Sequence, residues 1–128
     1  MPNRLLAKDQ NLQYNPLHKI RCAANGFWFA VVTDFSVAYK VVVSVVTLAL
    51  AMYYAGSVDV LLILVATSVM LMAELFNTAI EAICDYFETG YDEKIGAIKD
   101  VAAAAASVCI VVWFVVIAVE VYRVLYTY

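Results

Sequence analysis

Four polar side chains recur at helical spacing within residues 73–100, AELFNTAIEAICDYFETGYDEKIGAIKD. They are Glu74, Asn77, Glu81 and Asp85, spaced three, four and four residues apart. At about 100° per residue these positions form one stripe along a helix, within an arc of about 80°. An unpaired acid in mid-membrane costs at least about 2.5 kcal/mol. We therefore expect Glu74, about 10 Å deeper than Glu81, to face a polar cavity or partner and to be functional.

A second acid, Asp34, comes directly before the first long apolar run. Hard cations such as Mg²⁺ prefer oxygen ligands, so Asp34 and Glu81 are candidate metal ligands. Asp34 is equally well placed to cap a helix N-terminus, and the residues alone leave both interpretations open. Lys99, which opens the third apolar run beside Asp100, can neutralise phosphate charge or anchor the helix at the interface.

Several familiar kinds of site are excluded by composition. The four glycines do not form a P-loop or a GxGxxG motif, and the single histidine, His18, makes a Ser-His-Asp set implausible. Three cysteines without CxxC spacing indicate neither a disulfide framework nor a zinc site, and a net charge of −3 without a basic stripe does not indicate nucleic acid. The remaining possibility is a site with metal ligands and a lysine at the level of the lipid head groups and an acid deeper in the membrane. Such a site suits phosphoryl transfer from a nucleotide to a lipid hydroxyl.

The elements that must position these residues are membrane helices. The chain is 66% hydrophobic, and residues 35–54, 58–84 and 101–121 are each long and apolar enough to cross a bilayer core of about 30 Å. A soluble bundle would need a polar face that these runs lack. We predict a single all-α integral membrane domain over residues 1–128, with three transmembrane helices and a cytoplasmic connection at 85–100.

Within the first run, Lys40 is close enough to one end that we expect it to snorkel to the interface. Residues 1–33 form a cytoplasmic or interfacial segment in this prediction, and RCAANGFWFAVV within it is amphipathic enough to lie on the membrane as a helix. The segment lacks the apolar core of a secretory signal, so we expect it to remain in the mature protein. Seven of the eight basic residues fall on the N-terminal side, which predicts a cytoplasmic N-terminus and an outside C-terminus.

The sequence ELFNTAIEAICD, followed by IKDVAAAAA, resembles the signature of the prokaryotic diacylglycerol kinase family, which includes the undecaprenol kinases. The resemblance implies a homotrimer in the bacterial inner membrane, with active sites shared between neighbouring subunits. It implies transfer of the γ-phosphate of ATP to a lipid hydroxyl with the help of Mg²⁺.

The resemblance also assigns roles to single residues. It implies that Glu74 is the catalytic base, that Glu81 binds metal, and that Asp34 takes the place of a family glutamate before the first span. The implied ATP-binding residues are Lys99, Asp100, Asp85, Gly90, Tyr91, Asp92, Arg21 and Lys19, and the site-shaping residues are Asn77 and Ala103. Gly90-Tyr91-Asp92 departs from the usual Glu-Tyr-His of the family, and Lys19 and Arg21 are two candidates for its N-terminal arginine.

Three alternatives remain beside a diacylglycerol kinase. Undecaprenol kinase is one, although the alanine after Glu81 favours diacylglycerol. A small proton-coupled transporter with Glu74 as carrier is the second, but the stripe continues to the cytosolic end, whereas a carrier site belongs near the midplane. An inactive assembly subunit is the third. Because three helices alone are not expected to shield Glu74, Asn77 and Glu81 from lipid, we predict a homo-oligomer packed through the small residues 101–107.

Overall fold

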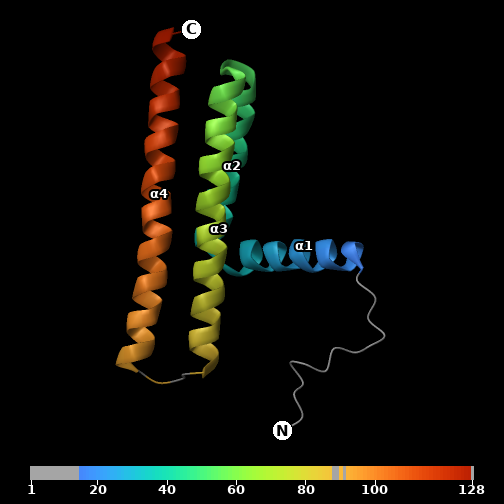
Figure 1. Cartoon of the computed structure of the whole chain (residues 1–128), viewed down its shortest axis with the longest axis vertical. Helices are drawn as coiled ribbons and strands as arrows, with labels where there is room; N and C mark the ends of the chain where they lie inside the picture. Colours follow the sequence, from blue (N-terminus) through green and yellow to red (C-terminus); the bar gives the residue numbers. More distant parts are fainter. Residues whose placement is uncertain (1–14, 88–89, 91, 128) are drawn as a thin grey trace.

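The computed structural model describes residues 15–87, 90 and 92–127, and every regular element among them is an α-helix, as predicted (Figure 1). The helices are α1 (Pro16–Thr33), α2 (Phe35–Tyr54), α3 (Ser57–Phe87) and α4 (Glu93–Thr127). The start of α1 follows from its sequence: the Asn15 side chain accepts the backbone N–H groups of Leu17 and His18, and Pro16 occupies the first helical position.

One residue, Asp34, separates α1 from α2. Its backbone is extended, with φ −118° and ψ 106°, so the chain changes direction there and α1 lies crosswise to the three long helices (Figure 1). The Asp34 Oδ1 atom accepts the backbone N–H of Ser36 at 2.9 Å, and Oδ2 accepts the Thr78 hydroxyl at 2.9 Å. The first bond caps α2, and the second holds the junction of α1 and α2 at the level of Thr78 on α3.

The three long helices, α2, α3 and α4, each have the length and apolar composition needed to cross a membrane. α3 packs against both of the others, most extensively against α4. α3 has 31 residues and α4 has 35, so at 1.5 Å per residue both exceed the bilayer core and continue past the level of α1 (Figure 1). α3 continues to Phe87 and α4 begins at Glu93, so the connection is shorter than residues 85–100.

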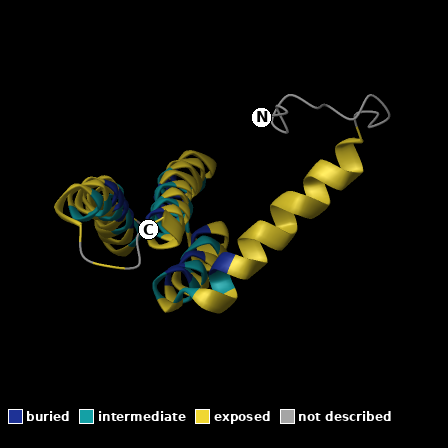
Figure 2. Ribbon diagram, turned by 90° about the horizontal axis from the view of Figure 1, so that it is seen from below, coloured by how far each residue is buried: buried dark blue, intermediate teal, exposed yellow. Residues whose placement is uncertain are grey.

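The buried positions lie on the inward sides of the helices, while the outer sides are exposed (Figure 2) and carry many apolar residues. Val37, Ile63, Met70 and Trp113 are among the buried apolar residues. The Trp113 Nε1–H donates to the Thr67 hydroxyl at 2.9 Å, which joins α4 to α3 in the interior. An exposed apolar exterior is what lipid contact requires of a membrane bundle, because the bilayer core solvates apolar side chains.

Helix α1 contacts the bundle only near its C-terminal end. Ala30 is its buried residue, and the remainder of the helix is exposed along most of its length (Figure 2). Trp28 and Phe29 are among its large apolar side chains on the surface. The predicted interfacial segment is therefore a helix held crosswise at one end of α2, and its position on a membrane surface stays a prediction.

Candidate functional site

The deepest part of the candidate site is an ion pair between α2 and α3. The Lys40 Nζ lies 2.6 Å from Glu74 Oε1, and the two side chains are 7% and 5% exposed. Nζ also donates to the Ser36 hydroxyl at 2.7 Å. Glu74 thus has the polar partner that its depth requires, since a buried charge persists only when it is paired and hydrogen-bonded.

Two expectations from the sequence are wrong at this point. Lys40 does not snorkel to the interface; its side chain points inward because Glu74 lies opposite it and compensates the loss of water. The second is the expected shielding of Glu74 by a neighbour, because Glu74 is only 4% exposed within one chain. For Asn77 and Glu81, which stay partly exposed in one chain, the predicted need of a neighbouring subunit stays a prediction.

The rest of the stripe becomes more exposed toward the end of α3. Glu74 is buried, Asn77 and Glu81 are half-buried, and Asp85 is exposed. The Asn77 Nδ2 donates to Glu81 Oε1 at 3.3 Å, while Asn77 Oδ1 is covered and has no hydrogen-bond partner within residues 15–87, 90 and 92–127. A covered amide oxygen without a donor costs about 1–3 kcal/mol, so this atom is a place for a ligand or water donor to bind.

The N-cap interpretation of Asp34 is confirmed, since its carboxylate accepts the backbone N–H of Ser36. Its second oxygen contacts Thr78, which precedes Glu81 by three residues on α3, so Asp34 is held about one helical turn from Glu81. In the part of the chain that the structure describes, no group of three or more metal-ligating side chains occurs. A pair of carboxylates still fits Mg²⁺, which often binds one or two protein carboxylates together with substrate phosphates.

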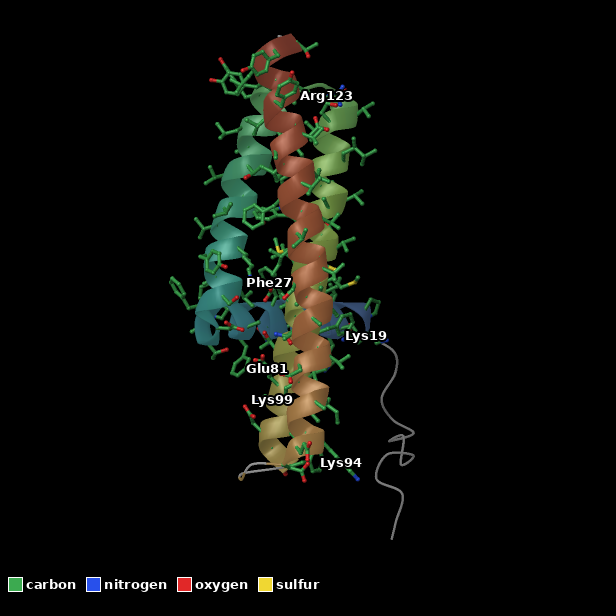
Figure 3. The ribbon with its side chains drawn as sticks, turned by 90° about the vertical axis from the view of Figure 1, so that its left-hand side faces the viewer. Lys19, Phe27, Glu81, Lys94, Lys99 and Arg123 are labelled. Atoms are coloured by element: carbon green, nitrogen blue, oxygen red, sulfur yellow. The ribbon has the colours of Figure 1, made fainter. Side chains whose placement is uncertain are left out.

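At the level where α3 and α4 extend past α1, Lys99 pairs with Asp85. The Lys99 Nζ lies 2.8 Å from Asp85 Oδ1, and the side chains are 38% and 68% exposed. Such an exposed pair is screened by water and contributes little to stability, so a phosphate group can replace Asp85 as the partner of Lys99. Figure 3 shows Glu81 and Lys99 on the side of α1 that faces the α3–α4 connection, with Lys94 further along.

The remaining predicted residues are spread over three regions. Asp92 caps α4 by accepting the backbone N–H groups of Lys94 and Ile95. Gly90 is exposed at the connection, and Tyr91 lies outside the described residues. The other members of the predicted site, Asp100 and Ala103 on α4 and Lys19 and Arg21 on α1, are all exposed in this chain. A single chain thus brings together the stripe, Asp34 and Lys99, but leaves α1 and the connection apart from them.

The contribution of α2 to the site was missed from the sequence, although a signal was present. Ser36, Lys40 and Ser44 recur every four residues within a run that is otherwise apolar. This spacing places them on one helix face, and in the structure that face carries the buried Lys40 and Ser44. A polar stripe on α2 opposite the stripe on α3 predicts that the two faces pack together.

The structure has three membrane-length helices and a column of polar side chains that runs from Lys40 and Glu74 through Asn77 to Glu81. This polar column within apolar helices defines a small helical membrane protein. The chain belongs to the prokaryotic diacylglycerol kinase family, because the family model described as prokaryotic diacylglycerol kinase matches residues 21–121. A search of curated proteins found no match. Membership in this family indicates a membrane lipid kinase.

Proposed function

We propose that the protein transfers the γ-phosphate of ATP to the free hydroxyl of diacylglycerol and so forms phosphatidic acid. The observation that carries this proposal is the buried Glu74 carboxylate at the inner end of a polar column that opens beside Lys99. A lipid hydroxyl can approach this depth from the membrane, while a nucleotide can approach only from the open end. Phosphoryl transfer from a nucleotide to a lipid requires that both substrates reach the same place in the site.

Glu74 acts as the general base in this mechanism and takes the proton of the lipid hydroxyl as the oxygen attacks phosphorus. Oε1 of Glu74 is engaged by Lys40 before the reaction, so the ammonium orients the carboxylate. When Glu74 takes the proton it becomes neutral, and Lys40 is left without its counter-ion. The ammonium is then available to an anionic oxygen of the transferring phosphoryl group, where charge stabilisation supplies much of the catalysis.

The nucleotide site lies at the open end in this proposal. Asp34 and Glu81 would hold Mg²⁺, which when bound neutralises phosphate charge. Lys99 exchanges Asp85 for a phosphate oxygen, and Asn77 offers Oδ1, which has no partner among the described residues, to a donor of either substrate. We assign the remaining nucleotide contacts to Asp100, to the connection at 90–92, and to Lys19 or Arg21 on α1.

The proposed assembly is a homotrimer in the bacterial inner membrane, with a cytoplasmic N-terminus and an outside C-terminus. The spread of Arg21, Asp100 and Ala103 over exposed surfaces of one chain favours sites completed by a neighbouring subunit. Glu74 and Asp34 lie together in one chain, so the test pairs Glu74→Gln with a variant of one of these exposed residues. Mixed oligomers of Glu74→Gln and Asp100→Asn subunits, each inactive alone, should regain partial activity. Subunit exchange must be verified by two different tags, and verified mixed oligomers without activity would contradict the shared site.

A transporter is disfavoured by the level of the ion pair. Lys40 is the sixth residue of the 20-residue α2, so it lies about 8 Å from the end of that helix rather than at its middle. A carrier site is expected near the midplane.

The test of the proposed function is a phosphorylation assay on the full-length protein in mixed micelles with γ-labelled ATP and Mg²⁺. One arm contains diacylglycerol, a second contains undecaprenol, and a third contains no acceptor lipid. We expect labelled phosphatidic acid as the main product. Faster labelling of undecaprenol would change the substrate assignment, and labelling in neither lipid arm would reject kinase activity.

A further inference from the structure

A second charged cluster lies at the end of the bundle away from Glu81 and Lys99, where Figure 3 shows Arg123. Arg123 Nη1 lies 2.6 Å from Asp59 Oδ1 on α3 and 3.5 Å from Glu120 Oε1, one turn earlier on α4. Asp59 is 3% exposed and Glu120 is 4% exposed, whereas the Arg123 side chain is 48% exposed. The proposed kinase mechanism uses none of these residues.

Glu120 is incompletely satisfied in this cluster. Its Oε2 is covered and has no hydrogen-bond partner among the residues that the structure describes, and its contact to Arg123 is long. Two carboxylates also face one guanidinium, which leaves one negative charge in excess. A buried carboxylate oxygen without a donor is costly, so the cluster calls for an additional cation with N–H groups.

Beside this cluster is an apolar cavity of about 250 Å³ between α2, α3 and α4. Leu50, Ala51, Ile63, Ile117 and Val124 are among the residues that line it, and Glu120 lines it as well. The cavity thus combines a hydrocarbon surface with one acidic side chain. A ligand that fits it has an apolar chain and a head that donates hydrogen bonds.

We propose that this end of the bundle binds a phospholipid with a primary ammonium headgroup. The ammonium donates to Glu120 Oε2, a hydrocarbon chain enters the cavity, and the half-exposed Arg123 faces the lipid phosphate. A quaternary ammonium has no N–H to donate, and an anionic glycerol headgroup is disfavoured by the surplus carboxylate. Charge and hydrogen bonding therefore select the primary amine among common phospholipids.

The test is native mass spectrometry of the full-length protein released from detergent with one phospholipid at a time. Phosphatidylethanolamine, phosphatidylcholine and phosphatidylglycerol with identical acyl chains serve as probes. We expect wild-type protein to retain phosphatidylethanolamine about tenfold better than the other two lipids, the scale of one hydrogen bond to a charged group. Glu120→Gln keeps the size of the side chain and should abolish this preference, whereas Glu93→Gln at the other end should leave it unchanged.

A second variant tests the cavity without touching the carboxylate. Ala51→Leu fills part of the space next to Glu120 and should weaken retention of all three lipids, with folding checked by circular dichroism. Equal retention of the three lipids by wild-type protein would overturn the proposal, as would an undiminished preference in Glu120→Gln. These readouts do not use kinase activity, so they stand or fall separately from the proposed function.

Discussion

The two ends of the bundle both bury acids beside a base, but they place the base differently. At one end Lys40 is as deeply buried as Glu74, whereas at the other Arg123 is half exposed while Asp59 and Glu120 are buried. The Lys40 end continues through Asn77 and Glu81 to the exposed Asp85, and the Arg123 end adjoins an apolar cavity. One end thus connects a deep acid to water, and the other offers a buried acid to a lipid-like ligand.

The largest stability effect should come from removing the buried ammonium. Lys40→Met leaves Glu74 buried without its partner, which typically costs about 3–5 kcal/mol in unfolding free energy. Arg123→Met should cost less, because water can reach the place of a half-exposed guanidinium. Equilibrium unfolding in mixed detergent measures both variants. The double variant Lys40→Met with Glu74→Met should recover most of the loss, and a double variant no more stable than the single would contradict the pairing.

The Lys40–Glu74 ion pair also shows which features could not be predicted from the sequence. Periodicity and hydropathy predicted three membrane helices and the stripe on α3, because both are properties of consecutive residues. The partner of Glu74 lies 34 residues away, and Asp59 and Arg123 are 64 residues apart. The inward position of Glu74 was expected from its depth, but Lys40, Asp59 and Arg123 viewed alone are each typical of a helix end near an interface. Only the packing of α3 against α2 and α4 shows that Lys40 and Asp59 are buried and which charges pair with each other.

Asp34 tests the proposed nucleotide site more sharply, because its role as helix N-cap can be separated from its proposed role as metal ligand. Asp34→Asn keeps one amide oxygen to cap α2 and places an NH2 group that can donate to the Thr78 hydroxyl, but it removes the charge that a metal ligand needs. It should therefore fold normally and require more Mg²⁺. Asp34→Ala should in addition lose about 1 kcal/mol of stability with the cap. Activity across a Mg²⁺ titration distinguishes the two. Wild-type Mg²⁺ dependence in Asp34→Asn would make this residue a helix cap only.

The smallest effect on stability is expected at Lys99. Its pair with Asp85 is exposed and screened by water, so Lys99→Gln should leave the unfolding free energy nearly unchanged. If Lys99 binds phosphate, the same variant should raise the KM for ATP about tenfold, the scale of one charge-assisted hydrogen bond. Lys94→Gln, on the exposed first turn of α4, is the matched control and should keep the wild-type KM. Equal KM values in the two variants would remove Lys99 from the nucleotide site.

The central claim is that the buried carboxylate of Glu74 is the base that activates a lipid hydroxyl. The most direct measurement is the rate of diacylglycerol phosphorylation by Glu74→Gln, compared with wild type and with Glu93→Gln at the exposed start of α4. Gln keeps the size of the side chain and can still contact Lys40, so the protein should fold while its rate falls about 10²–10⁴-fold. Glu93→Gln should retain the wild-type rate. Near-normal phosphorylation by a folded Glu74→Gln variant would contradict the account and leave Glu74 as a structural partner of Lys40.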